Sequence, residues 1–306
     1  MLKKIAFAAA TSAAISALTT SPCLAFDYQP FDWVPLPQGT NVLMGYYQYA
    51  SRNSYNSTLF GTVKKDTNLD SELGIGRYLY YNKIFNHDYV LDLVVPFGGL
   101  TGGKIANQRL NSASGFSDPL MSAGVWLISD PKQKRYVSAA SFVTVPIGNY
   151  DRHKTLNLGG NRWVHDLQVD YTQGLTDKIT LDVSGDWTYY GDNTQAGPTG
   201  AQTLTENSSY SAYAWITYDV TSELKRIVPS ALPASVSVGY LGEFGGVQKI
   251  GGMRDGGKTE EQAIRASYTQ MLTPTLQGII SVNHDVESAG QFNERFALLA
   301  RVAKLF

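Results

Sequence analysis

Apolar and polar residues alternate along most of the chain after residue 39. Between residues 178 and 190, one face of an extended chain carries Leu181, Val183 and Trp187, and the other carries Asp182 and Asp186. A period of two residues is typical of a β-strand that buries one of its faces. The pattern therefore predicts an all-β protein built from amphipathic strands.

The same alternation divides the chain into twelve predicted strands of eleven to fifteen residues. We expect them at residues 40–52, 68–82, 87–97, 117–129, 136–147, 162–174, 178–190, 208–221, 235–247, 259–272, 275–287 and 294–306. Strands of this length cross a bilayer at a tilt, with some overhang. An even number of strands is expected of a closed transmembrane antiparallel β-barrel of the outer-membrane type.

Charged residues gather on one face of most predicted strands. In residues 87–97, Asp88 and Asp92 lie opposite Leu91 and Leu93. A charge that faces lipid at mid-bilayer costs roughly 2–4 kcal/mol, so a lipid-facing outer wall explains the segregation. A soluble β-sandwich also alternates, but its polar face would be richer in Lys and Glu.

Two predicted strands fit this scheme less well. Arg77 shares a face with Leu73 and Ile75, and residues 40–52 have no clean polar side. A β-bulge near Arg77 would restore the alternation.

The last predicted strand, residues 294–306, ends on the aromatic residue Phe306. Outer-membrane barrels resemble one another in such an ending, which the barrel-assembly machinery recognises and which pairs with the first strand. An ordinary amphipathic edge strand or a helix is the alternative for thirteen residues alone. The eleven other strands favour the barrel, with Phe306 as the barrel-closing terminus.

The amino terminus indicates export. Lys3 and Lys4 precede an Ala-rich apolar run, and residues 1–25 have the features of a signal peptide cleaved after Ala25. Cleavage removes Cys23, which lacks the preceding residues of a lipoprotein signal, and leaves a chain without thiols. Removing two lysines also shifts the formal charge from −1 to about −3, which argues against a nucleic-acid partner.

The mature chain divides into two parts and points to the bacterial outer membrane. Residues 26–39 are rich in Pro and aromatic residues and are expected as a periplasmic lead-in, and residues 40–306 form the barrel. The mean hydropathy of −0.17 resembles that of a soluble protein. A barrel accounts for this value, because only alternate residues face the outer-membrane lipids.

The predicted connections alternate between short and long. Those at residues 82–86, 130–135, 175–177 and 273–274 are turn-like, with 220–234 as a long exception on the same side. Those at 53–67, 98–116, 148–161, 191–207 and 248–258 are longer and rich in Gly, Asn and Ser. Bacterial barrels place short turns in the periplasm and long loops outside the cell.

Strand parity predicts which side chains line the lumen. The expected acids are Asp88, Asp92, Asp118, Asp166, Asp170, Asp182, Asp186, Asp219, Glu243 and Asp285. The expected cations are Arg162, Lys178, Arg265, Arg295 and Arg301, and the expected aromatic residues are Trp126, Phe142, Tyr213 and Trp215. An internal ion-pair network, with packed aromatic side chains, is the alternative for most of them. If a path is open, the excess of acids disfavours anions.

Two other sequence features do not indicate a nucleotide-binding or catalytic site. Residues 252–259 match the phosphate-loop pattern, but they are followed by a predicted strand rather than a helix, so no nucleotide and no cofactor is expected. His165 and His284 face outward near strand ends and have no serine-rich surroundings that would form a hydrolase site. We therefore expect no catalytic, cofactor-binding or metal-binding residues.

Several spaced runs carry a family resemblance. They are residues 115–119 (GFSDP), 146–151 (PIGNYD), 156–163 (LNLGGNRW), 171–175 (YTQGL) and 190–197 (YGDNTQAG). In this order they resemble the outer-membrane transporters of the meta-cleavage pathway of phenol degradation. The resemblance implies a channel for passive uptake of small hydrophobic or aromatic, phenol-like solutes. A structural or adhesive barrel without transport, and an outer-membrane lipid-modifying enzyme, are the alternatives.

Overall fold

The computed structural model describes residues 28–57, 61–197, 199–254 and 258–306. The expected signal peptide, residues 1–25, lies outside the described residues. Within them, no helix is long and apolar enough to cross a membrane.

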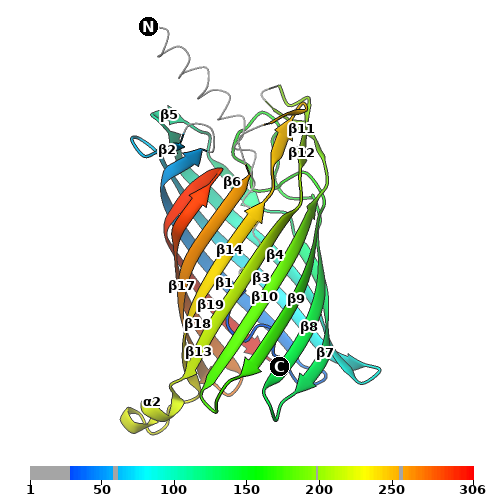
Figure 1. The fold of residues 1–306 in the computed structure, drawn as a ribbon, viewed down its shortest axis with the longest axis vertical. Helices are drawn as coiled ribbons and strands as arrows, with labels where there is room; N and C mark the ends of the chain where they lie inside the picture. Colours follow the sequence, from blue (N-terminus) through cyan, green and yellow to red (C-terminus); the bar gives the residue numbers. More distant parts are fainter. Residues whose placement is uncertain (1–27, 58–60, 198, 255–257) are drawn as a thin grey trace.

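Twelve long antiparallel strands form a closed barrel, as the sequence predicted (Figure 1). They are β1 (Asn41–Ser57), β3 (Asn68–Ile84), β4 (His87–Ile105), β7 (Leu120–Asp130), β8 (Arg135–Thr144), β9 (Val164–Gly174), β10 (Ile179–Tyr190), β13 (Ser209–Asp219), β14 (Ala234–Gly245), β17 (Thr259–Thr273), β18 (Leu276–Ala289) and β19 (Gln291–Leu305). Each pairs with the next along the chain, and β19 pairs with β1. Closure leaves no unpaired strand edge in the hydrocarbon layer.

The two ends of the barrel differ. We call one the turn end, because most of its connections are short; Phe85 and Asn86 alone join β3 to β4, with φ of 46° and 66°, the geometry of a two-residue hairpin turn. The helix α2 (Thr221–Ile227) occupies the longest connection at this end. The opposite end, called the loop end, carries β2 (Gly61–Val63), β5 (Gln108–Arg109), β6 (Ala113–Phe116) and a four-stranded sheet of β11 (Asn193–Ala196), β12 (Gln202–Glu206), β15 (Gln248–Ile250) and β16 (Met253–Arg254).

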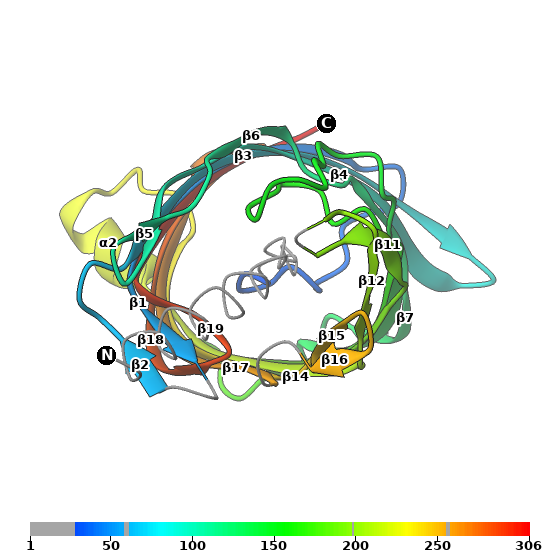
Figure 2. The same cartoon turned by 90° about the horizontal axis from the view of Figure 1, so that it is seen from above.

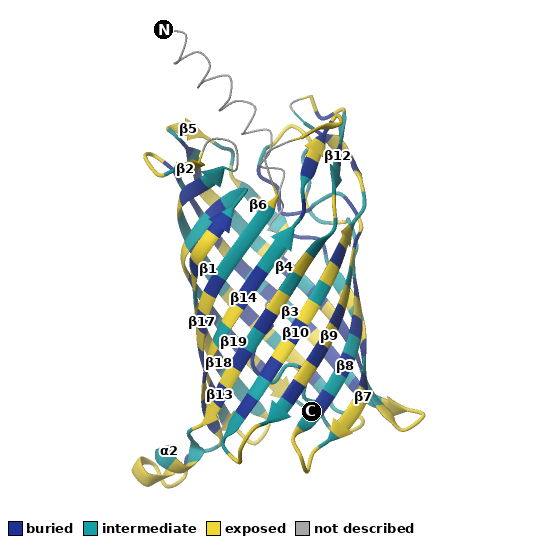
Figure 3. Cartoon of the chain, viewed as in Figure 1, coloured by how far each residue is buried: buried dark blue, intermediate teal, exposed yellow. Residues whose placement is uncertain are grey.

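Buried and exposed residues alternate along the strands (Figure 3). In β10, Asp182 and Ser184 are buried, whereas Val183, Trp187 and Tyr189 are exposed. Apolar side chains on the outer wall suit lipid, and polar side chains are kept inside.

The inner wall is not polar throughout, and this explains Arg77. Leu73, Ile75 and Arg77 are all buried, and β3 keeps an unbroken register with both neighbours around them. The bulge suggested for Arg77 is therefore wrong. Apolar residues share the inner face with the arginine, while Gly74 and Gly76 occupy the alternating outer positions.

Three charged residues expected in the lumen lie elsewhere. Lys178 is in the turn before β10, where its Nζ lies 2.6 Å from Glu223 Oε1 of α2. Asp219 is exposed at the end of β13. A register shift between β1 and β19 leaves Arg295 without a partner in β1 and turns it outward. Because the side-chain period in a strand is two, one extra residue reverses the assigned face.

The segment before β1 lies inside the barrel rather than beyond it. Residues 28–36, expected within a periplasmic lead-in, cross the interior as an irregular chain (blue in Figure 2). Tyr28 and Trp33 are 2% and 6% exposed and belong to the main buried cluster. We call residues 28–36 the plug.

Candidate functional site: the plugged lumen

Two indole groups and a guanidinium hold the backbone of the plug. Trp215 Nε1 and Arg265 Nη1 each donate a hydrogen bond to the carbonyl oxygen of Tyr28, both at 3.1 Å. Trp126 Nε1 donates to the carbonyl oxygen of Trp33 at 2.8 Å. These bonds satisfy backbone and indole groups that would otherwise be buried without partners.

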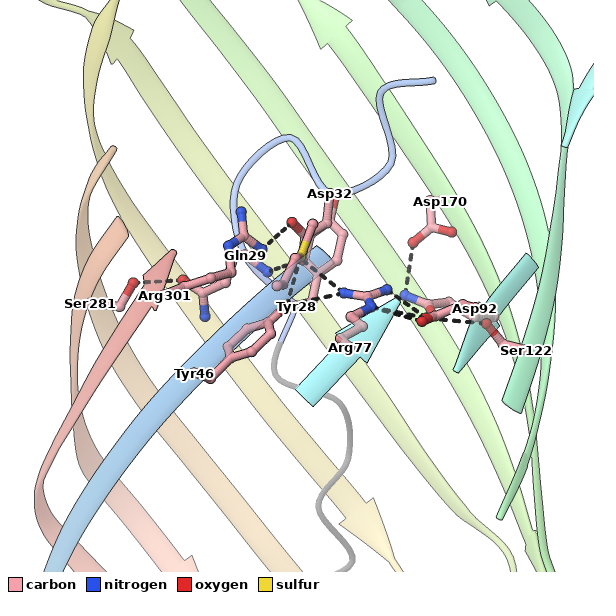
Figure 4. A network of polar contacts seen from close by, with 12 residues as sticks. Tyr28, Gln29, Asp32, Tyr46, Arg77, Asp92, Ser122, Asp170, Ser281 and Arg301 are labelled. Atoms are coloured by element: carbon pink, nitrogen blue, oxygen red, sulfur yellow. Dashed lines mark hydrogen bonds and ion pairs between the residues drawn. The ribbon is translucent and has the colours of Figure 1, made fainter. Parts of the chain in front are cut away.

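Asp32 of the plug contacts arginines on β19 and β3, the two strands on either side of β1 (Figure 4). Its Oδ1 lies 2.6 Å from Arg301 Nη1 of β19, and its Oδ2 lies 3.9 Å from Arg77 Nη1 of β3. Arg77 also forms a two-pronged ion pair with Asp92 of β4, with Nη2 to Oδ2 at 2.7 Å. All these side chains are at least nine-tenths buried, so the ion pairs are poorly screened by solvent.

Aromatic side chains pack the plug against the wall. The ring of Trp33 lies 6.2 Å from that of Trp126 and 6.1 Å from that of Phe142, and the ring of Tyr28 lies 6.0 Å from that of Tyr213. Gly124 makes room for this packing, because a Cβ there would lie 2.9 Å from the Trp33 ring. The plug therefore fills the barrel on the side of the turn end.

The predicted acids of β9 and β10 form a ladder along the wall beside the plug. Asp182, Asp170, Asp186 and Asp166, which we call the acid ladder, are held by Ser, Thr and Gln side chains; Thr172 Oγ1, for example, donates to Asp182 Oδ1 at 2.6 Å. In the part of the chain that the structure describes, none of the four forms an ion pair, and Asp182 Oδ2 has no hydrogen-bond partner. The ladder packs against the plug, with Asp182 close to the backbone of Phe31.

A cavity of about 300 Å³ lies between the plug and the loop end. One wall is apolar and comes largely from β3 and β4; it includes Leu73, Ile75, Val94 and Leu100. Another part of the wall is polar and comes from β14, β17, β18 and β19; it includes Glu243, Glu261, Asn283 and Glu294. Arg265, Ser281 and Tyr213 line the cavity and also contact the plug, so the plug lies directly behind this part of the cavity wall.

The loop of residues 145–163 turns inward at the loop end (Figure 2), and its residues Leu156, Leu158 and Gly160 line the cavity. Leu156 and Leu158 are buried against the apolar wall. Asp118 holds this loop by accepting hydrogen bonds from the backbone N–H groups of Gly148 and Gly160, at 2.7 and 2.6 Å. Burial raises the pKa of Asp118, and the two N–H groups oppose that rise.

An ion pair ties this loop to the small sheet. Arg162 pairs with Glu206 of β12, and Gln248 Nε2 of β15 donates to the same carboxylate at 3.0 Å. Burial raises the pKa of Glu206, and the neighbouring Arg162 guanidinium works against that rise. Arg162 is thus inside, as expected, but it belongs to the loop rather than to a strand.

Most residues that strand parity assigned to the lumen face the interior, but they lie in three different places: around the plug, near the turn end and at the cavity. Trp126, Phe142, Trp215, Arg301 and Asp92 contact the plug or the charged groups around it. Asp88 lies near the turn end, 3.3 Å from Lys83 Nζ. Of the chosen set, Asp118, Arg162, Tyr213, Glu243 and Arg265 border the cavity.

Several residues that shape this site were not predicted from the sequence. Asp32, Tyr28 and Trp33 belong to a segment without strand periodicity, so no parity assigned them to the interior. Glu261 and Glu294 were overlooked although parity places Glu261 on the same face as Arg265. Among the described residues, no three His, Cys, Asp or Glu side chains are grouped as a metal site would need.

Comparison with known proteins identifies the family of the chain and a solved barrel of the same fold. A family model described as "Putative MetA-pathway of phenol degradation" matches residues 49–297. The crystal structure of an outer membrane channel from Pseudomonas putida F1 is 26% identical, with a TM-score of 0.82 over 92% of this chain and 100% of that one. No curated protein matches the sequence.

More distant barrels add little. The transport unit of the autotransporter AIDA-I from Escherichia coli is 8% identical, with a TM-score of 0.49 over 96% of each chain. The toluene transporter TbuX from Ralstonia pickettii is also 8% identical, with a TM-score of 0.40 over 89% of this chain and 90% of that one. Similarity at this level gives no information about which solute the present chain transports.

Proposed function

Because the chain belongs to the family of the MetA-pathway of phenol degradation, we propose that it is a channel for passive uptake of small hydrophobic or aromatic, phenol-like compounds across the outer membrane. The observation that carries the proposal is the cavity between the plug and the loop end. Its volume of about 300 Å³ suits a molecule with one aromatic ring. Its apolar wall offers a surface for the ring, and its polar wall offers partners for a hydroxyl group.

The orientation follows from the two ends. The long connections of the loop end face the cell exterior, and the short turns face the periplasm. A solute enters at the loop end and reaches the cavity. It leaves towards the periplasm only when the plug moves, because the plug fills the lumen on that side. Concentration difference alone drives the passage, with no nucleotide involved.

A structural barrel without transport is the second candidate. The plug favours it, since Asp32 and the packed Trp33 close the lumen on the side of the turn end. The two functions differ in whether the plug moves out of the lumen under ordinary conditions.

Uptake by vesicles distinguishes the two. We would reconstitute the mature protein into vesicles with lipopolysaccharide in the outer leaflet, which slows the direct entry of hydrophobic solutes, and follow the entry of labelled phenol and of glucose. A channel of the proposed kind speeds phenol entry over protein-free vesicles, and does so more than for glucose. If neither the mature protein nor a form lacking residues 26–36 speeds phenol entry, the barrel is structural.

A further inference from the structure

The connection between β13 and β14 carries a short amphipathic helix with an uncovered apolar face. Leu224 and Ile227 are three residues apart and so share one face of α2, and Val228 follows directly after the helix. None of the residues of α2 is buried; Ile227 is 80% exposed and Val228 is 46% exposed. A helix of this length is marginal in water on its own, so a surface that covers its apolar face would stabilise it.

The opposite side of α2 is cationic. Lys225 and Arg226 are both exposed, and in the part of the chain that the structure describes neither side chain forms an ion pair. The two nearby acids have partners of their own: Glu223 Oε1 lies 2.6 Å from Lys178 Nζ, and Asp219 accepts a hydrogen bond from the backbone at the start of the helix. An apolar face flanked by unpaired cations is typical of a helix that lies in a membrane interface.

Contacts at its base hold α2 on the lipid-facing side of the wall. Tyr218, which is 38% exposed on the outer face of β13, donates a hydrogen bond to Glu223 Oε1 at 3.1 Å. Thr221 Oγ1 accepts a hydrogen bond at 3.0 Å from the backbone N–H of the first residue of β14, which closes the neck of the connection. In two perpendicular views, α2 projects sideways beyond the ring of strands at the turn end (Figures 1 and 2). It therefore lies beside the apolar outer wall of β13 and β14, where Ile216 and Val236 are exposed.

We propose that α2 lies in the periplasmic leaflet of the outer membrane and binds anionic phospholipids there. Leu224, Ile227 and Val228 enter the layer beneath the headgroups, and Lys225 and Arg226 bind the phosphate groups. The leaflet follows from the proposed orientation, in which the turn end faces the periplasm. This inference goes beyond the proposed function, because it holds whether or not the barrel carries a solute.

A protein is a less suitable partner for this surface. Stable protein interfaces bury about 1,200–2,000 Å² in total, and a seven-residue helix offers only part of that area. Lipid already adjoins the wall beside α2, and it supplies both an apolar layer and negative charges. The membrane therefore matches both sides of the helix.

Quenching of fluorescence by brominated lipids tests the depth of α2. A fluorescent label on Ile227→Cys in the mature protein reports contact with brominated acyl chains in phosphatidylcholine vesicles. We expect several-fold stronger quenching than for the same label on Lys132→Cys, in the exposed turn between β7 and β8. Equal quenching at the two positions would place α2 in water and reject lipid as its partner, which would leave a second copy or a periplasmic protein as the occupant.

The preference for anionic lipid is tested by adding brominated phosphatidylglycerol to the vesicles. Per molecule, it should quench the label at position 227 about threefold more strongly than brominated phosphatidylcholine, because each nearby cation attracts anionic lipid. Replacing both cations, Lys225→Gln with Arg226→Gln, should remove this preference. Salt at about 1 M should also remove it without any substitution, because the screening length falls to about 3 Å.

Lys64→Gln with Lys65→Gln is the matched control. These two adjacent lysines are also exposed but lie at the loop end, next to β2, so their replacement changes the net charge equally and should leave the preference unaltered. Heat-modifiable mobility on gels shows whether each variant is folded; if the α2 variant is not, the salt dependence decides alone. Equal quenching by the two lipids, a preference that survives in the α2 variant, or an equal loss in the control overturns the proposal.

Discussion

Asp32 of the plug and Arg301 of the final strand are joined by an ion pair of 2.6 Å across 269 residues of sequence. Arg301 lies in β19, which pairs with β1 to close the barrel. Arg77 of β3, on the other side of β1, approaches the same carboxylate. One side chain of the plug is therefore bound to both neighbours of the first strand, which couples the position of the plug to the closed barrel.

Replacing Asp32 by Asn should loosen the plug. The change leaves the buried Arg301 guanidinium without its carboxylate, and breaking a buried ion pair costs roughly 3–5 kcal/mol. Because the strand pairing does not depend on Asp32, we expect a folded barrel with higher single-channel conductance and a shifted tryptophan emission from Trp33. Asp88→Asn is the control, since its partner Lys83 is half exposed and such pairs contribute about 0–1 kcal/mol. Equal conductance in wild type and Asp32→Asn would show that the plug is held by other contacts.

Gly124→Ala tests the packing of the plug without changing any charge. The new methyl group would meet the Trp33 ring at 2.9 Å and Val90 at 3.3 Å, in a site closed by Ala140. Overpacking of this kind costs roughly 1–3 kcal/mol, so Trp33 should move and the plug should be more accessible to protease. Gly76→Ala serves as the comparison, because nothing lies within 4 Å of its added Cβ. A plug as resistant to protease in Gly124→Ala as in Gly76→Ala would contradict the packing described.

The strands were predictable and the plug was not, for a physical reason. Strands in lipid need an apolar residue at every second position, so the sequence records their number. Their ends are recorded less well, because β1 and β4 continue past the predicted ends at residues 52 and 97, to Ser57 and Ile105. The plug is an irregular chain, and its contacts depend on residues far away, such as Arg301 and Trp215. Arg77 was misjudged because we assumed a uniformly polar lumen, and Arg295 because one register shift reverses the faces of a strand.

Orientation in the membrane can be tested by labelling single cysteines on whole cells. Cysteines replacing Gln108 and Thr199 lie at the loop end and should react with an impermeant thiol reagent. A cysteine replacing the exposed Lys132, in the turn between β7 and β8, should react only after the outer membrane is permeabilised. The mature chain is expected to contain no other thiol, so labelling is specific. The reverse pattern would invert the assigned orientation.

Removal of Phe306 should impair assembly more than it impairs stability. Its backbone forms the last hydrogen-bonded pair with Asn41, at 2.9 and 3.0 Å, while its ring is 65% exposed and packs little. An exposed ring contributes little to the packed interior but is accessible to the barrel-assembly machinery that we expect to recognise this terminus. Deleting Phe306 or replacing it by Asp should lower the amount of heat-modifiable barrel in the outer membrane several-fold. Leu305→Ala provides a comparison at the neighbouring, partly buried position; equal losses would indicate a packing effect instead.

The acid ladder should govern stability rather than ion selectivity. The lining of the cavity, over the residues that the structure describes, includes Glu243 but none of the four ladder acids. Asp182 is fully buried, and only its Oδ1 accepts a hydrogen bond, from Thr172. Asp182→Asn keeps that acceptor and removes a charge that has no counter-ion, so the melting temperature should rise by a few degrees.

Asp170→Asn should act in the same direction. Both Asp170 oxygens accept hydrogen bonds, from Ser138 Oγ at 3.1 Å and Gln168 Nε2 at 2.9 Å. The amide oxygen of an asparagine can still accept from Gln168, and its Nδ2 can donate to the Ser138 hydroxyl, which accepts as well as donates. The melting temperature should therefore rise in both variants, while the ratio of cation to anion conductance should remain that of the wild type. Glu243→Gln, which alters the cavity itself, should lower that ratio. A lowered ratio in Asp170→Asn or Asp182→Asn would mean that ions pass beside the plug, and that the plug does not seal this wall.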